Sequence, residues 1–114
     1  MGVARQRGRA AEDLARAYLE LSGSAVCERN VRLGGVEFDM VAEDGNTQVV
    51  VEVKYRQSSE YGGAALAVDG SKRARLLRAA RALEPRGPVR IDVVAIELTP
   101  EGAQVRHYRN AITQ

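Results

Sequence analysis

Residues 48–55, which read Gln-Val-Val-Val-Glu-Val-Lys-Tyr, decide the fold of this chain. β-Branched side chains dominate the stretch, and apolar residues occupy both of its alternating faces. A strand of this kind is typical of the centre of a sheet that other elements cover on both sides. The stretch therefore predicts a central, buried strand. Near its end, Glu52 and Lys54 are two residues apart and so are expected on one face.

Two segments have the three- and four-residue apolar spacing of an amphipathic helix. The first runs from about residue 5 to 22, and its predicted buried face consists of Ala10, Leu14, Ala17, Tyr18 and Leu21. The second can be capped by Asp69 or Ser71, runs to about Leu83 and stops before Pro85. Its predicted buried face consists of Leu76, Ala79, Ala80 and Leu83, with Arg75, Arg78 and Arg81 opposite.

Four further segments have strand character and are separated by turns that contain glycine or proline: residues 25–33, 36–42, 89–98 and 104–109. The predicted order is α-β-β-β-α-β-β. Because a helix connects strand 48–55 to strand 89–98, we expect a right-handed crossover and a parallel pair there. The first three strands are expected to form an antiparallel meander. The sequence thus predicts an α/β fold, a three-layer core in which helices flank a mixed sheet.

The composition sets limits on the class of protein. A length of 114 residues fits a single domain over residues 1–114, and 45% hydrophobic residues argue against a disordered chain. One cysteine, Cys27, excludes an internal disulfide and a cysteine-based zinc site. Apolar runs are shorter than a membrane span and no secretory signal is seen, so we expect a cytoplasmic protein. We expect Cys27 in the core and His107, the single histidine, on the surface of a strand.

Basic residues gather in one part of the chain. The formal net charge is only +2, which excludes a histone-like tail, but residues 72–90 contain one acid, Glu84, beside a run of bases: Lys72, Arg73, Arg75, Arg78, Arg81, Arg86 and Arg90. A basic stretch of this kind suits a site that faces a polyanion. The polar face of a solvated helix is the commoner explanation of such a run.

Asp39, Glu52 and Lys54 are the candidate chemical group. Asp39 lies on the strand before Glu52, and strand pairing can bring the two carboxylates together. Adjacent carboxylates repel unless a cation lies between them, and hard oxygen ligands suit Mg²⁺ or Mn²⁺. Lys54 would then orient or deprotonate a water, or stabilise charge on a phosphoryl group. The pattern suits metal-assisted phosphodiester hydrolysis, although acid-x-lysine also forms ordinary cross-strand salt bridges.

Several blocks in a fixed order and spacing point to a family: residues 8–15, 29–32, 37–41, 50–56, 61–62, 72, 91–94 and 110–111. With them the chain resembles the bacterial UPF0102 family, also called the YraN family. That family groups predicted endonucleases related to archaeal Holliday junction resolvases, with the PD-(D/E)xK restriction-endonuclease-like fold. One departure is Val36, where the family usually has glycine before its Glu-x-Asp.

The resemblance implies a role for each matching residue. Asp39 and Glu52 would bind the metal, and the backbone carbonyl of Val53 would add a ligand. Lys54 would be the catalytic lysine, and Glu12 would contribute to the metal or water shell of the catalytic group. Glu37 is expected to be a structural group or one that supports the metal ligands, and not a ligand itself. The candidate contacts to nucleic acid are Arg56, Lys72, Arg75 and Arg78.

Three classes of function remain open. The first is a Mg²⁺- or Mn²⁺-dependent endonuclease, with DNA favoured over RNA and with branched or structured DNA as the candidate substrate. If the analogy to junction resolvases holds, a homodimer is expected, because paired cuts need two active sites. The second is a non-catalytic nucleic-acid-binding module with a nuclease fold. The third is a structural or adaptor protein in which the acids belong to a salt-bridge cluster.

Overall fold

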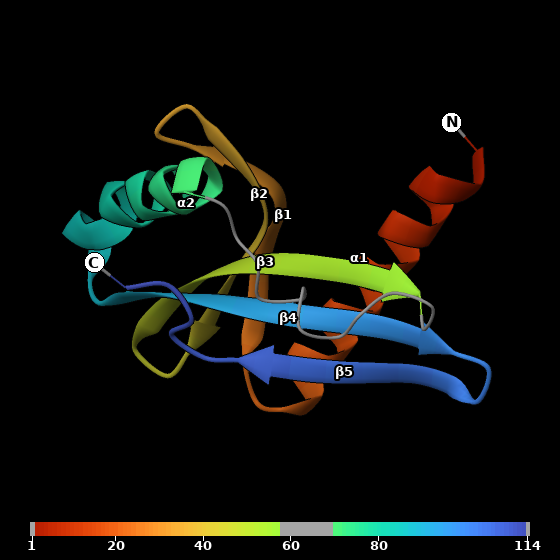
Figure 1. Ribbon diagram of the computed structural model, residues 1–114. Helices are drawn as coiled ribbons and strands as arrows, with labels where there is room; N and C mark the ends of the chain where they lie inside the picture. The colour runs from red at the N-terminus through yellow and green to blue at the C-terminus, as the bar shows by residue number, and fades with distance from the viewer. Residues whose placement is uncertain (1, 58–69, 114) are drawn as a thin grey trace.

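The computed structural model describes residues 2–57 and 70–113. Its elements, shown in Figure 1, are α1 (Gly2–Leu21), β1 (Ala25–Leu33), β2 (Val36–Asp44), β3 (Thr47–Gln57), α2 (Gly70–Leu83), the 3₁₀ turn η2 (Glu84–Arg86), β4 (Val89–Thr99) and β5 (Gly102–Tyr108). The family block at Tyr61 and Gly62 lies outside the described residues. Within the described part, none of the helices has the length and apolarity needed to cross a membrane.

The five strands form one sheet in the order β1-β2-β3-β4-β5, with β3 at its centre. β3 and β4 are parallel and joined through α2, whereas the other neighbouring pairs are antiparallel. The predicted α/β fold is confirmed: the sheet is mixed, helices flank it, and the order is α-β-β-β-α-β-β. The apolar run of β3 explains its central place, because both of its faces are covered by packed side chains.

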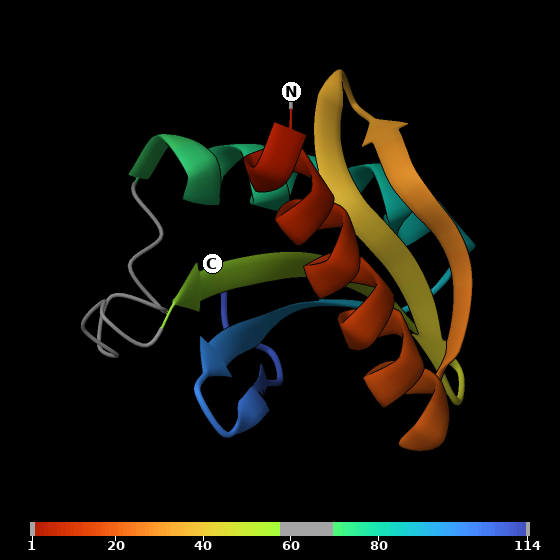
Figure 2. The same ribbon diagram turned by 90° about the vertical axis from the view of Figure 1, so that its right-hand side faces the viewer.

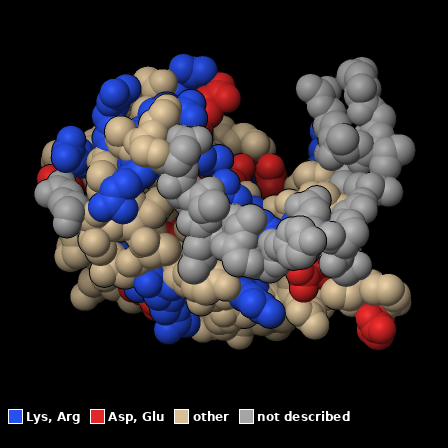
Figure 3. Space-filling model, in the orientation of Figure 1, with Lys and Arg blue, Asp and Glu red and all other residues tan. Residues whose placement is uncertain are grey.

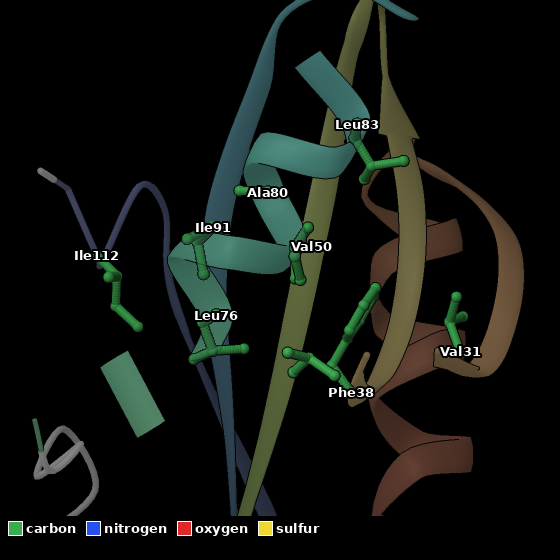
Figure 4. Packing of buried hydrophobic residues seen from close by; sticks show 10 residues of the cluster. Val31, Phe38, Val50, Leu76, Ala80, Leu83, Ile91 and Ile112 are labelled. Carbon is green, nitrogen blue, oxygen red and sulfur yellow. The ribbon is translucent and has the colours of Figure 1, made fainter. Parts of the chain in front are cut away.

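Two hydrophobic cores lie on the two faces of the sheet. The α2 core, shown in Figure 4, consists of Val31, Val36, Phe38, Val50, Leu76, Ala79, Ala80, Leu83, Ile91 and Ile112. The α1 core consists of Ala11, Ala15, Leu19, Met40, Ala42, Val49, Val51, Val94 and Ile96. Figure 2 shows α1 running across the sheet on the face that bears the second core. Alternation along β3 separates the two cores, since Val50 belongs to one and its neighbours Val49 and Val51 to the other.

Strand β2 contributes to both cores. Val36 and Phe38 belong to the α2 core, whereas Met40 and Ala42 belong to the α1 core. Residues two apart on a regular strand share a face, so this exchange requires that β2 twists strongly between Phe38 and Met40. Asp39 lies between Phe38 and Met40, where β2 passes from one core to the other.

The predicted buried face of α1 is wrong for four of its five residues. Ala10, Leu14, Ala17 and Leu21 are exposed, and Leu21 retains 90% of its accessible surface. The helix instead buries Ala11, Ala15 and Leu19, a stripe with equally good helical spacing. Small alanines let the helix axis approach the sheet closely, which favours this face. Tyr18, by contrast, does pack against the α1 core. For α2, the predicted buried face is correct.

Two single-residue expectations are also wrong. Cys27 is exposed, because the register between β1 and β2 shifts between Val26 and Glu28 and disturbs the alternation there. His107 is not a surface residue: its side chain is 6% exposed and lies against the buried carboxylate of Asp92.

Candidate active site

The candidate site lies where backbone pairing between β2 and β3 ends. Their Cα register runs from Asp44 opposite Thr47 to Met40 opposite Val51. The next residue of β2 is Asp39, whose Oδ2 accepts a hydrogen bond of 2.6 Å from the backbone N–H of Val53. Beyond Met40, the Asp39 side chain and not a backbone carbonyl of β2 therefore accepts the hydrogen bond from β3. This contact fixes the Asp39 carboxylate against β3.

Asp39 and Glu52 form a carboxylate pair. Their side chains are in hydrogen-bond contact, and Glu52 is only 4% exposed. Burial, followed by the hydrogen bond to Glu52 and the charge of Glu52, raises the pKa of Asp39 to about 7. The charge of Glu12 acts in the same direction, and the Val53 N–H acts against it. The pair therefore attracts either a proton or a cation.

Lys72 supplies a positive charge to this pair. It lies in the first turn of α2, and its ammonium forms an ion pair with Oε2 of Glu52. The sequence predicted Lys72 as a phosphate contact, so its place beside the acids was not foreseen. A pocket opens around this contact, lined by Asn30, Val36, Glu37, Phe38, Asp39, Glu52, Val53, Lys72, Arg75 and Leu76.

Glu12 lies on α1 and is held by Arg29 of β1. The distance from Arg29 Nη2 to Glu12 Oε1 is 3.6 Å, and Arg29 Nη1 lies 2.8 Å from Asp13 Oδ1. These residues line a second hollow beside the first. Across residues 2–57 and 70–113, no three acids, histidines or cysteines gather closely enough to hold a metal ion. In this structure Asp39 and Glu52 are therefore a pair of candidate ligands, without Glu12 as a third.

The two-carboxylate arrangement fits a magnesium-type cation. Mg²⁺ usually binds to one or two carboxylates and keeps several water ligands, so a third acid is not required. The ammonium of Lys72 already lies against Glu52, which shows that this position takes a positive charge. The chemistry of the donors and the ion pair thus both suit a divalent cation.

The other predicted site residues lie on β3, α2 and β2. Lys54 follows Glu52 by two residues on β3 and is partly exposed, as is Arg56. Arg78 is exposed on α2. Among the described residues, Lys72 and Arg75 line the pocket, whereas Lys54, Arg56 and Arg78 do not. Glu37 is exposed, and its Oε1 lies 2.7 Å from Nη2 of Arg32.

Asn30 lines both hollows and was missed in the sequence. It lies on β1 between the register pairs Arg29–Met40 and Val31–Phe38, and its φ is 52°. A left-handed conformation is uncommon outside glycine, and asparagine tolerates it better than most residues. The available signal was an asparagine in the middle of a strand pattern.

A second polar cluster surrounds Asp92, which is fully buried. Its carboxylate accepts hydrogen bonds from Arg90 Nε (3.0 Å) and Nη2 (3.1 Å) and from the backbone N–H of Asn110 (2.9 Å). His107 Nε2 lies 2.7 Å from Asp92 Oδ2, and His107 Nδ1 lies 3.1 Å from the hydroxyl of Tyr18. Burial alone would raise the pKa of Asp92, but these hydrogen bonds outweigh burial and lower the pKa. The cluster joins α1, β4 and β5.

Basic side chains cover the outer face of α2. Figure 3 shows Lys and Arg gathered over this helix, at the upper left. The exposed members on α2 are Arg73, Arg75, Arg78 and Arg81. The pocket with the carboxylate pair opens beside this basic surface, because Arg75 belongs to both.

The fold and the site together define an α/β protein with a carboxylate pair, one acid buried and one partly buried, where the pairing of two strands ends. Residues 11–96 match the family described as "Uncharacterised protein family UPF0102", and the chain belongs to this family, as the sequence predicted. It is 45% identical over 112 residues to a UPF0102 protein of Halorhodospira halophila, covering 96% of this chain and 89% of that protein. A UPF0102 protein of Stutzerimonas stutzeri is 39% identical over 117 residues, covering 97% of this chain and 98% of the relative.

A solved structure also shows limited similarity. It is described as "The structure of Pyrococcus Furiosus SfsA in complex with Ca2+". The match has a TM-score of 0.39 and 18% sequence identity, and it covers 93% of this chain and 63% of that chain. A TM-score this low does not bear on the function.

Proposed function

We propose that this protein is a metal-dependent endonuclease that hydrolyses phosphodiester bonds in DNA, with branched or structured DNA as its candidate substrate. The observation that carries the proposal is the contact between the carboxyls of Asp39 and Glu52, one of them almost fully buried. Two neighbouring carboxylates repel each other, so this arrangement favours the binding of a cation between them. A divalent cation bound there would neutralise the pair and would lie, with its water ligands, in the open pocket that both acids line.

Mg²⁺ or Mn²⁺ is the cofactor that these donors favour. Asp39 and Glu52 would hold it, with the backbone carbonyl of Val53 as a further ligand. When bound, the ion would activate a water and polarise a phosphoryl oxygen. Lys54 would orient the attacking water or stabilise the developing negative charge, and Glu12 would act on the surrounding waters. The hydrogen bond from the Val53 N–H to Oδ2 of Asp39 would help to hold this carboxylate in position.

The basic surface of α2 supports a nucleic-acid substrate. Arg75 and Lys72 line the pocket, so a phosphate that enters it meets positive charge beside the acids. Arg78 and Arg56 are proposed as further contacts to the backbone. Paired cuts in a four-way junction would require a homodimer. DNA is favoured over RNA by analogy with nucleases of this proposed class.

The second candidate function is a nucleic-acid-binding module without turnover. The observation in its favour is the ion pair between Lys72 and Glu52, which compensates the buried acid without any metal. A protein of this kind would bind DNA equally well with and without Mg²⁺. It would also keep its affinity for DNA in Glu52→Ala.

The test is to incubate the protein with Mg²⁺ or Mn²⁺ and labelled linear, nicked, flapped and four-way-junction DNA, with an RNA duplex alongside. Asp39→Ala removes a proposed ligand, and Asp44→Ala is the matched control, an acid at the other end of β2 that pairs with Arg90. We expect metal-dependent cleavage by the wild type and Asp44→Ala but not by Asp39→Ala. Metal-independent binding without cleavage by all three proteins would favour the binding module instead.

A further inference from the structure

Lys72 lies where the proposed metal would need to be. Its ammonium contacts Oε2 of Glu52, an acid that is itself in contact with Asp39. Three ionisable side chains of the proposed site are thus neighbours: Asp39 of β2, Glu52 of β3 and Lys72 of α2. A metal that binds to Glu52 must compete with this ammonium for the same carboxylate.

Charge balance decides the outcome of that competition. The two carboxylates carry at most two negative charges, which one divalent cation neutralises. The ammonium of Lys72 would then be an excess positive charge beside the metal, and like charges at short distance repel. Lys72 can leave, because 34% of its side chain is exposed and its four-carbon stem is flexible.

The place to which Lys72 moves is suggested by its neighbour. Arg75 lies three residues further along α2, is exposed, and lines the same pocket. Side chains three residues apart lie on the same side of a helix. An ammonium that moves away from Glu52 toward solvent would lie on the same side of the helix as the guanidinium of Arg75, and a backbone phosphate between them would bind both cations.

We propose that Lys72 is an exchangeable counter-cation: it neutralises Glu52 while no metal is bound, and metal binding releases it to hold a backbone phosphate together with Arg75. The inference rests on the proposed function and deepens it, because it makes metal binding the event that completes the nucleic-acid site. Metal and nucleic acid then bind with positive coupling that passes through Lys72.

The first test measures the chemical reactivity of the Lys72 amine. The chain contains only two lysines, Lys54 and Lys72, so mass spectrometry after brief treatment with an amine-acetylating reagent follows each of them separately. We expect slow acetylation of Lys72 in EDTA and clearly faster acetylation in Mg²⁺, relative to the N-terminal amine. Glu52→Gln should raise the rate in EDTA above that of the wild type and reduce the effect of Mg²⁺, because it removes the carboxylate charge that pairs with Lys72.

Calorimetry with Mn²⁺ in the same samples separates the two proposals. Absence of metal binding would overturn both the proposed function and this inference. Metal binding with no change in the reactivity of Lys72 would overturn the exchange alone and leave the metal site standing.

A second test uses Lys72→Met, which keeps most of the apolar stem and removes the charge. Its matched control is Arg81→Met, which removes one charge from an exposed position of the same helix outside the pocket. We expect Lys72→Met to bind Mn²⁺ about 10-fold more tightly than the wild type, since no ammonium competes for Glu52. Arg81→Met should bind Mn²⁺ like the wild type. Equal metal affinity of Lys72→Met and the wild type would contradict the exchange.

Nucleic-acid binding gives the third readout. In a Lys54→Met background, which prevents turnover if Lys54 is catalytic, the salt dependence of duplex binding is measured with and without Mg²⁺. With Mg²⁺, Lys72→Met should lose about one phosphate contact from the salt slope; without it, the two slopes should agree. A difference of the same size under both conditions would show that Lys72 contacts phosphate without any exchange, and would refute the inference.

Discussion

The backbone N–H of Val53 donates a 2.6 Å hydrogen bond to Oδ2 of Asp39, so the acid of β2 is held against β3 one residue beyond Glu52. This contact explains how two acids can lie together in a folded protein. One oxygen of Asp39 is bound to the backbone, and Glu52 is bound to the ammonium of Lys72. In this structure, both carboxylates therefore have a partner from another part of the chain.

Asp39→Asn separates the charge of this residue from its hydrogen bond. The amide oxygen of asparagine can still accept the bond from Val53, but the negative charge is lost. We expect the affinity for Mn²⁺ to fall at least about 100-fold, because loss of even an indirect ligand partner costs about 10–100-fold. Calorimetry checks this, with Asp44→Asn as the control. Unchanged affinity in Asp39→Asn would remove Asp39 from the metal site.

The raised pKa of Asp39 makes the stability of the metal-free protein depend on pH. The pKa rises from an ordinary 3.8 to about 7, so between these values the folded protein keeps a proton that the unfolded chain has released. In that window this carboxyl makes the free energy of unfolding fall as the pH rises, and above about pH 7 its effect is complete.

Urea unfolding in EDTA tests this dependence in the wild type and in Asp39→Asn. We expect the free energy of unfolding of the variant, relative to the wild type, to be higher at about pH 8 than at about pH 5, because the variant lacks the ionising group. Parallel pH profiles for the two proteins would show that Asp39 ionises normally.

The two acids that pair with Arg90 should differ sharply in their effect on stability. Asp92 is fully buried and binds Arg90 and His107, whereas Asp44 Oδ2 contacts Arg90 Nη1 at 2.9 Å and its side chain is 41% exposed. Asp92→Ala should lower the free energy of unfolding by about 3–5 kcal/mol, because it leaves a buried base without its partner. Asp44→Ala should cost less than about 1 kcal/mol. Denaturant unfolding at neutral pH measures both, and similar losses would be inconsistent with the buried cluster.

Leucines on the two sides of α1 provide a test of how this helix packs. Leu19 belongs to the α1 core, while Leu21 is almost fully exposed. Leu19→Ala should lower the free energy of unfolding by about 2–5 kcal/mol through loss of packing and formation of a cavity. Leu21→Ala should change it by no more than about 0.5 kcal/mol. The reverse order would mean that α1 packs through the face that the sequence favoured.

Sequence reasoning succeeded where one pattern had one interpretation. The β-branched run around Val50 predicted a buried strand, and the crossover through α2 predicted that β3 and β4 are parallel, as the structure has them. It failed for α1, where two apolar stripes compete and the larger side chains of Leu14 and Leu21 favoured the wrong one. Which stripe is buried depends on how closely the helix approaches the sheet, and that is a tertiary property.

For the candidate site, the sequence located the acids but not their partners. Asp39 and Glu52 could be brought together by strand order alone, because they lie on neighbouring strands. Lys72 reaches Glu52 only through the placement of α2 above the sheet, and local spacing does not encode that placement. His107 was misjudged for the same reason, since its partners Asp92 and Tyr18 come from other elements.

The exchange of β2 between the two cores has a mechanical consequence for Asp39. Phe38, on one side of it, is anchored in the α2 core, and Met40, on the other side, is anchored in the α1 core. The backbone of Asp39 is thus held on both sides by side chains that pack in different hydrophobic cores. A shift of either core would therefore be transmitted to the position of this carboxylate. Folding therefore places the carboxyl groups of Asp39 and Glu52 side by side, and the pair is preorganised before any ligand binds. A mutation in the interior of either core should therefore change the relative position of the two carboxyl groups, even if the mutated residue contacts neither of them.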